Sequence, residues 1–316
     1  MKSSRLKRIL SLLLCLACMA AVCGCRTAPV ASHDKPKVVA TIFPQYDFVR
    51  AIAGDLVELE MLIDPGSEVH GFDPTFSQIE DIVGADLFVY VGGESDAWVD
   101  GVLSKSGAAC RTLKLVDCVT LLNEETVEGM QTEEGEACEQ DAFDEHVWTS
   151  PQNAMRIVER LTEELILLLP EQEATLQQNC DAYLAKLSAL DEGFQAVMQN
   201  AARTTVVFAE RFPFLYLCRA YGITYYAALK GCSSNEEVSL KTIAFLIDKV
   251  NEEQLPTVFY IEFSSEKVAN TIADATGVET LRLHSCHNVS KADFDNGVTY
   301  LDLMWQNVES LRKAVS

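Results

Sequence analysis

The chain has few basic residues for its length. It contains 25 lysines and arginines against 47 aspartates and glutamates, which gives a formal net charge of −22 at pH 7. Nucleic-acid binding needs lysine and arginine side chains that neutralise phosphates, and no segment offers a basic face of that kind. We therefore expect no nucleic-acid partner. The acidic excess mainly favours solubility, although it also attracts cations weakly and in a salt-dependent way.

Cysteine motifs and hydrolase motifs are missing as well. Four of the eleven cysteines lie in or at the end of the N-terminal apolar segment, and the other seven include no CxxC pair. A four-cysteine zinc site and a thioredoxin-type redox motif therefore have no support in the sequence. HExxH and GxSxG are also absent, which argues against a zinc peptidase and against an α/β-hydrolase.

The N-terminus has the pattern of an export signal. Four basic residues between positions 2 and 8 precede an apolar run over 9–22, which ends in Val22-Cys23-Gly24-Cys25. The run is short for a membrane span, and its end is typical of a lipoprotein cleavage site. We expect a signal peptide over 1–24, lipidation of Cys25 and a tether over 25–36. An uncleaved anchor and a soluble secreted protein are the alternatives.

The remaining length of about 290 residues suffices for two domains. From residue 37 onward, apolar β-branched runs alternate with helical patterns, which predicts an α/β fold with mostly parallel sheets. The expected strands are 38–43, 57–63, 86–92, 111–116, 204–209, 223–229, 256–262 and 279–283.

The pattern predicts two lobes joined by one long, rigid helix. Apolar residues recur at helical spacing over 171–200, which would give a helix about 40 Å long. It separates an N-terminal α/β lobe over 37–170 from a C-terminal α/β lobe over 201–316. Residues 123–145 are strongly acidic and lack periodicity, so we expect a solvated, mobile loop there. A metal-collecting role for this loop is the alternative.

Four side chains are candidate metal ligands: His70, His146, Glu210 and His284. The chain has only five histidines, and three of the four candidates follow strand-like runs. Ligands of open α/β sheets bind beyond the carboxyl ends of the strands. Imidazoles and a carboxylate that converge there would hold a divalent cation.

Some of these assignments have alternatives. Glu210 could instead form an ion pair with a neighbouring arginine at 211 or 219. His287 or Asp293 could replace His284 as the fourth ligand. Glu262 ends a strand in a similar way and could orient a ligand imidazole from behind.

The motifs around these residues resemble a known family. The segments MLIDPGSEVHGFDPTFSQIEDIVGADLFVYVGG, DEHVWTSPQNA and FAERFPFLYLCRAYGI are similar to the ligand motifs of the metal-binding (cluster A-I, zinc/manganese) solute-binding proteins of bacterial ABC transporters. The resemblance covers essentially the whole chain after the tether. It places His70, His146 and Glu210 on the first three ligands, and His284 on a fourth that is usually aspartate.

The resemblance implies a function without a chemical step. The protein would be a monomer, lipid-anchored outside the cytoplasm, that captures Zn²⁺ or alternatively Mn²⁺. It would deliver the ion to an ABC permease driven by its ATPase. Nitrogen-rich ligands favour zinc over manganese. A metal-binding surface adhesin and a secreted zinc hydrolase are the rival functions.

Overall fold

The structure is a computed structural model that describes residues 35–106, 110–131, 142–231 and 237–316. The predicted signal peptide, Cys25 and nearly all of the tether lie outside the described residues. Residues 36–316 form one unit, which contains two sheets. Among the described helices, none is both long enough and apolar enough to cross a membrane.

The N-terminal lobe is built on a four-stranded parallel sheet with the strand order β2-β1-β3-β4. Its central strands are buried on both faces, as expected for parallel strands covered by helices. The strands are β1 (Lys37–Ala40), β2 (Glu58–Met61), β3 (Leu87–Tyr90) and β4 (Arg111–Lys114). The helices are α2 (Phe43–Ala53), α3 (Phe76–Val83), α4 (Trp98–Ser106) and α5 (Pro151–Leu168).

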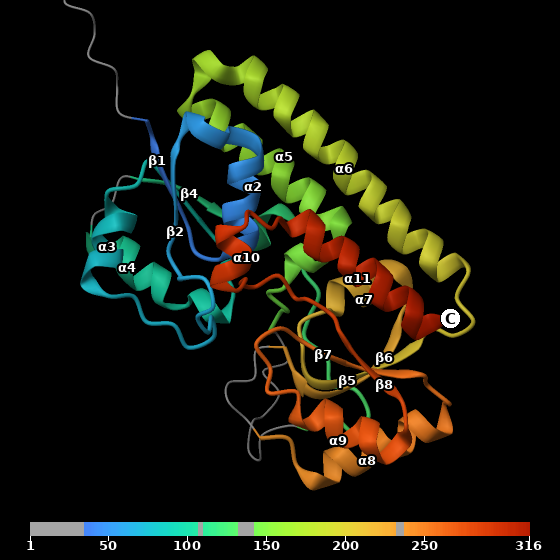
Figure 1. The fold of residues 1–316 in the computed structure, drawn as a ribbon. Helices are drawn as coiled ribbons and strands as arrows, with labels where there is room; N and C mark the ends of the chain where they lie inside the picture. Colours follow the sequence, from blue (N-terminus) through green and yellow to red (C-terminus); the bar gives the residue numbers. More distant parts are fainter. Residues whose placement is uncertain (1–34, 107–109, 132–141, 232–236) are drawn as a thin grey trace, which may run out of the picture. The chain divides into compact units, whose positions relative to one another are not determined.

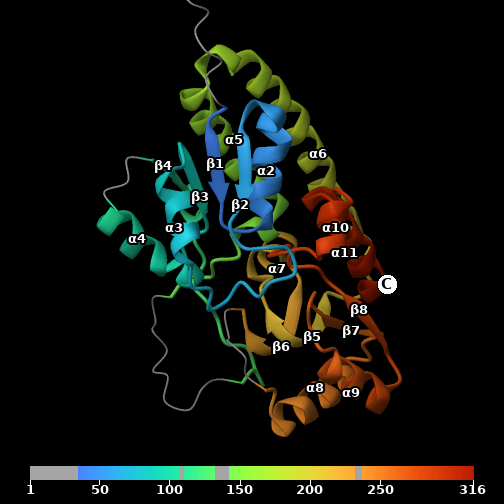
Figure 2. The same ribbon diagram turned by 60° about the vertical axis from the view of Figure 1, so that its left-hand side comes forward.

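The C-terminal lobe repeats this plan with the strand order β6-β5-β7-β8, again parallel. Figure 2 shows the two sheets one above the other, with α8 and α9 at the far end of the second lobe. The strands are β5 (Thr205–Phe212), β6 (Thr224–Lys230), β7 (Thr257–Tyr260) and β8 (Glu279–Arg282). The helices are α7 (Leu215–Tyr221), α8 (Leu240–Glu252), α9 (Lys267–Thr276), α10 (Lys291–Asp295) and α11 (Tyr300–Val315). The predicted α/β class and all eight strands are confirmed.

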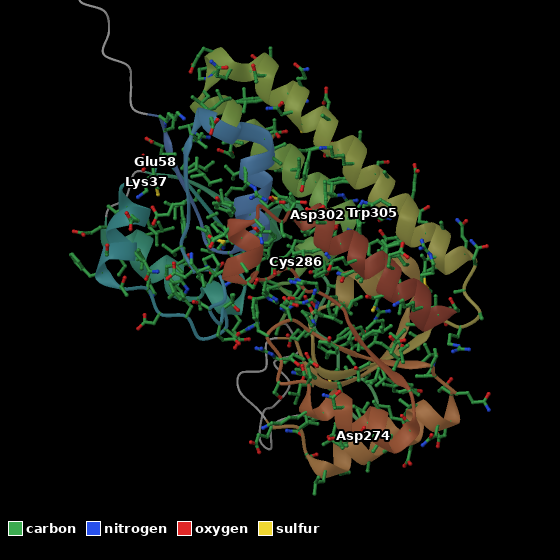
Figure 3. The ribbon with its side chains drawn as sticks, viewed as in Figure 1. Lys37, Glu58, Asp274, Cys286, Asp302 and Trp305 are labelled. Atoms are coloured by element: carbon green, nitrogen blue, oxygen red, sulfur yellow. The ribbon has the colours of Figure 1, made fainter. Side chains whose placement is uncertain are left out.

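The long helix expected over 171–200 is α6 (Glu173–Gln199), which has 27 residues. Its buried residues recur at helical spacing and pack against α5, α2 and α11. Figure 1 shows α6 running along both lobes with α11 beside it. The two helices approach closely at Gly193, where a Cβ atom would lie 2.7 Å from the Trp305 ring. Trp305 and Asp302 mark α11 in Figure 3.

The C-terminal segment does not stay in its own lobe. Backbone Tyr300 N donates to the buried Asp47 carboxylate on α2, and Arg50 on the same helix donates to Val298 O. The backbone of Phe43 also donates to His287 O. The last helices therefore fasten the C-terminal lobe to the N-terminal one, an arrangement that the predicted boundary at 201 does not include.

The acidic segment 123–145 is described at its two ends. Asn123 and Phe143 form an antiparallel bridge, and Asp144 N donates to Leu122 O. Met130 is buried against the core. These ends are thus packed and hydrogen-bonded rather than solvated throughout, because they pair with each other directly before His146.

Candidate metal centre

His70 lies on the loop between β2 and α3. The loop leaves the carboxyl end of β2, and Gln78 Nε2 on α3 holds it by donating to Leu62 O at 2.8 Å. His70 Nδ1 lies 3.0 Å from Glu68 Oε1. A carboxylate can only accept, so Nδ1 carries the proton in this pairing and Nε2 keeps its lone pair.

His146 lies directly before α5. Ser150 caps this helix by accepting from Asn153 N, with Pro151 at the first helical position. The imidazole is completely buried. Its Nδ1 lies 3.0 Å from Asp144 Oδ1, and the same oxygen accepts from His146 N at 2.8 Å.

His287 comes from the segment that follows β8. Cys286 adopts a left-handed backbone with φ of 64°, which turns the chain just before His287. Figure 3 places Cys286 between the two lobes. His287 Nδ1 lies 2.7 Å from Ser285 Oγ, and that hydroxyl in turn hydrogen-bonds to the Glu262 carboxylate.

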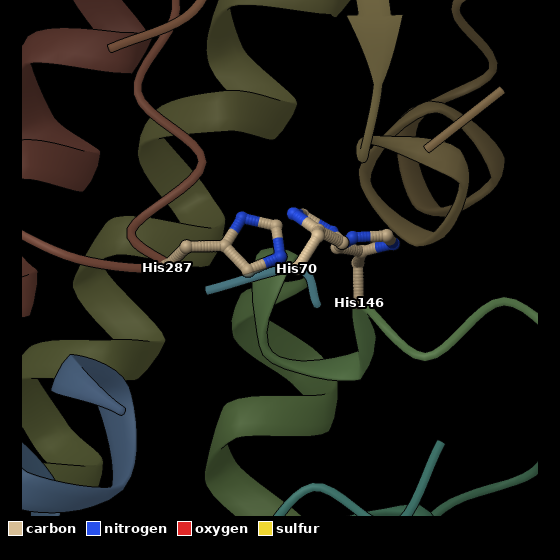
Figure 4. Close-up of side chains that lie close together, drawn as sticks. All are labelled: His70, His146 and His287. Atoms are coloured by element: carbon tan, nitrogen blue, oxygen red, sulfur yellow. The ribbon is translucent and has the colours of Figure 1, made fainter. Parts of the chain in front are cut away.

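These three histidines converge (Figure 4). One ligand atom of each lies within 4.8 Å of the others. All three Nε2 atoms are buried and lack a hydrogen-bond partner among the described residues. Buried polar atoms are rarely left unpaired. Three such imidazole nitrogens, each with a free lone pair, therefore fit a site that binds a metal cation. Trp148 packs on two of the rings, at centroid distances of 5.6 Å from His146 and 4.9 Å from His287.

The electrostatics of the three imidazoles differ. Burial opposes a charge on His146, but the carboxylates of Asp144, Glu145 and Glu124 outweigh it and raise the pKa above the usual value. Burial and the neighbouring His146, His70 and Arg211 lower the pKa of His287 well below its usual value. His287 is therefore neutral and ready to bind a cation at physiological pH.

Glu210 and His284, two of the predicted ligands, lie outside this group. Glu210 Oε1 accepts from Ser264 Oγ at 2.8 Å, and burial raises the pKa of its carboxyl. His284 Nδ1 accepts from Cys286 N at 3.0 Å, and Asn307 binds both its backbone N–H and its carbonyl. The imidazole of His284 thus stabilises the turn that presents His287.

Glu262, the predicted orienting residue, contacts the group through a serine. Its Oε2 accepts from Ser285 N at 2.7 Å, while its other oxygen bonds the Ser285 hydroxyl. That hydroxyl contacts His287 Nδ1. The Glu262 carboxylate therefore positions the Ser285 hydroxyl, which in turn orients the His287 imidazole.

Sequence reasoning left His287 as an alternative and did not single out Arg211. Arg211 Nη1 lies 3.1 Å from His70 Nδ1, and Nη2 lies 3.2 Å from Glu68 Oε2. At this irregular end of β5, Arg211 reaches His70 while Glu210 contacts Ser264. The register shift of β5 between Phe208 and Arg211 leaves no mark in the sequence pattern.

A cavity of about 250 Å³ opens beside the group. His70, His287 and Arg211 contribute to its wall, and so do the carboxylates of Glu68 and Glu262. Asn288 also lines it and donates to Asp64 O and Ser67 O, which ties the segment of His287 to the loop of His70. The site is therefore assembled from both lobes.

Comparison with known families gives one match over nearly the whole described region. Residues 38–314 match the family described as zinc-uptake complex component A, periplasmic, or ZnuA. The zinc-binding lipoprotein AdcA of Streptococcus pneumoniae is 30% identical over 305 residues, which cover 96% of this chain and 60% of that protein. The high-affinity zinc uptake system protein ZnuA of Bacillus subtilis is 28% identical, with 95% of each chain covered.

Solved structures agree with this match. The Zn(II)-bound ZnuA-like domain of Streptococcus pneumoniae AdcA superposes with a TM-score of 0.75 at 28% identity, covering 89% of this chain and 99% of that one. The metal-dependent lipoprotein YcdH of Bacillus subtilis gives 0.76 at 28% identity, with the same coverage. The chain spans about 60% of the length of the AdcA lipoproteins of Streptococcus pneumoniae that it matches.

Proposed function

Because the chain belongs to the zinc-uptake complex component A family, we propose that it captures Zn²⁺ outside the cytoplasm and delivers it to an ABC permease. The ligands are Nε2 of His70, His146 and His287. The zinc is the cargo, and the protein carries out no chemical step on it. The family is one of uptake components and not of enzymes.

The convergence of three unpartnered Nε2 atoms carries this proposal. Histidines that bind zinc typically donate their other ring N–H to a carboxylate, carbonyl or hydroxyl, which sets the tautomer and the ring orientation. Each of the three has such a partner: Glu68, Asp144 or Ser285. The three imidazoles are thus oriented for a cation before it arrives.

The donor set favours zinc over manganese. Affinity of nitrogen ligands for divalent metals rises from Mn²⁺ towards Cu²⁺, with Zn²⁺ well above Mn²⁺, and Mn²⁺ prefers oxygen. Glu210, which would have supplied a carboxylate, is turned towards Ser264. Metal analysis of protein purified without an affinity-tag metal tests this preference. Manganese as the main co-purified metal would contradict it.

The location and the partners follow from the lipoprotein pattern. We propose that Cys25 carries the lipid that holds the protein at the outer face of the cell membrane, where it meets the permease and its ATPase. Two observations support this: the Val22-Cys23-Gly24-Cys25 pattern and the description of AdcA as a zinc-binding lipoprotein. Protein docking that separates the lobes would release an ion held by residues of both.

A matched pair of asparagine variants tests the ligand set. In His287→Asn, the side-chain amide can still hydrogen-bond where Nδ1 did, but it has no atom at the position of the ligand nitrogen Nε2. The binding free energy of a four-ligand zinc site is about 10–16 kcal/mol, which is roughly 3 kcal/mol per ligand. Loss of one ligand should therefore lower zinc affinity about a hundredfold or more. In His284→Asn, the amide oxygen can still accept from Cys286 N, and zinc affinity should stay unchanged.

Competition titration against a chelator measures both constants, and thermal unfolding of the metal-free proteins controls for folding. Wild-type zinc affinity in His287→Asn would refute the assignment. A strong loss in His284→Asn with normal affinity in His287→Asn would restore the ligand expected from the sequence.

A further inference from the structure

The three imidazoles leave the metal incompletely coordinated. Zinc sites are usually four-coordinate, and a binding site without a chemical step is expected to fill all four positions. Among the described residues, the group that can share one ion consists of His70, His146 and His287 alone. The three ligands are neutral, so the carboxylates that offset the charge of the cation, Glu68 and Asp144, lie behind the imidazoles and not in contact with the ion.

The nearby carboxylates are already engaged elsewhere. Glu68 binds His70 Nδ1 and the Arg211 guanidinium, so it lies behind the imidazole rather than in front of Nε2. Glu262 accepts from both the backbone and the hydroxyl of Ser285. Glu210 accepts from Ser264. Using any of them as the fourth ligand would break a contact that positions a ligand histidine or the adjacent loop.

Arg211 is the cation in the wall of the cavity. Its guanidinium has five N–H donors, and its hydrogen-bond acceptor in the described part of the chain is the Glu68 carboxylate. Donors therefore remain for a further acceptor. A fixed positive charge beside a cation site weakens cation binding, and the single carboxylate of Glu68 cannot offset both the charge of Arg211 and that of the metal.

We propose that the open position is filled by a small planar oxyanion from solution, a carboxylate or bicarbonate, which binds the metal and Arg211 together. This inference rests on the proposed function, because it requires the metal on the three imidazoles. A guanidinium matches the paired oxygens of such an anion with two parallel hydrogen bonds. The cavity of about 250 Å³ beside His70, His287 and Arg211 has room for it.

The cargo is then a metal–anion pair with one net positive charge. The anion compensates part of the metal charge and satisfies the free donors of Arg211. The protein carries Arg211 as a specificity-determining residue for the anion, while the three histidines select the metal.

Cobalt-loaded protein tests the proposal, because the visible spectrum of Co²⁺ reports its ligands. Acetate, bicarbonate and chloride are each titrated into wild type, Arg211→Gln, Arg211→Lys and Arg312→Gln. Arg312 is an exposed residue of α11 that pairs with Glu309, so its replacement controls for the change in net charge. Arg211→Lys keeps the charge and loses the planar fork.

In the wild type, acetate or bicarbonate should change the spectrum saturably and at lower concentration than chloride. The anion with the lower half-saturation identifies the source of the oxyanion. Arg211→Gln should raise the half-saturating concentration at least about tenfold, the loss of a charge-assisted hydrogen bond. The half-saturating concentration of Arg211→Lys should lie between those of the wild type and Arg211→Gln. That of Arg312→Gln should equal the wild-type value.

A wild-type spectrum that no anion changes would overturn the proposal, and so would equal titrations of wild type and Arg211→Gln. In each of these outcomes the protein still binds one Co²⁺ per chain, so the proposed function stands. Failure to bind Co²⁺ at all would instead refute the proposed function.

Discussion

Replacing Gly231 by alanine should weaken zinc binding through the position of one imidazole. Gly231 follows β6 and lies against the ring of His146. An added Cβ atom would lie 2.8 Å from His146 Cε1, 3.2 Å from its Nδ1 and 3.0 Å from Phe212 O. Carbon atoms in contact normally lie about 3.5–4.0 Å apart, so the ring or the strand must move by roughly 0.7 Å or more.

The ring has little room to move away. His146 is completely buried, Asp144 holds its Nδ1, and Trp148 packs on it. Overpacking of this kind costs about 1–3 kcal/mol, and a metal site loses function when its ligands shift by about 0.5 Å. We therefore expect zinc affinity to fall by about five- to a hundredfold, since 1.4 kcal/mol corresponds to a factor of ten.

Chelator-competition titration of Gly231→Ala measures the effect. Gly101→Ala is the matched control, because a Cβ atom there would have nothing within 4 Å and the residue lies in α4. It should bind zinc like the wild type. Wild-type affinity in Gly231→Ala, with or without reduced thermal stability, would show that the packing of Gly231 on His146 does not set the geometry of the site.

Three further outcomes are expected. Zinc affinity should fall as the pH drops from about 8 to about 5.5, by up to tenfold per pH unit once one proton competes with the metal. The raised pKa of His146 lets a proton compete at this ring, while the lowered pKa of His287 keeps that ring neutral. Chelator competition across this pH range measures the effect, and an affinity that does not change with pH would contradict it. Cys25→Ser should release the protein from membranes or leave the precursor uncut, as fractionation would show; normal processing with membrane retention would speak against lipidation. The radius of gyration from small-angle scattering should change little when zinc binds, since α6 and α11 run along both lobes; a large decrease would indicate hinge closure.

The fold could be predicted because its signals are local and repeated. Each strand is an apolar, β-branched run between helical patterns, and α6 carries its buried residues at regular helical spacing. The ends of the strands were predicted one to three residues too long at several places, since apolar residues continue into the loops. The return of α11 to the N-terminal lobe depends on contacts such as Tyr300 N with Asp47, which no local pattern reveals.

The site could be predicted only in part for a related reason. His70 and His146 lie in distinctive loop motifs, so their importance is visible in the sequence. The choice between His284 and His287 depends on the left-handed turn at Cys286, a conformation that non-glycine residues seldom adopt. That Arg211 lies beside His70 while Glu210 contacts Ser264 depends on the register shift of β5 between Phe208 and Arg211, which no local sequence pattern reveals.

The bond between Asn288 and the loop of His70 has a mechanical consequence. Asn288 follows His287 directly and holds Asp64 O and Ser67 O, so the two loops behave as one linked body. Any force that pulls this body away from α5 withdraws two of the three imidazoles in a single movement. Loss of the ion would then be an abrupt, all-or-none event rather than a stepwise loosening, and the trigger need touch only one short stretch of the surface.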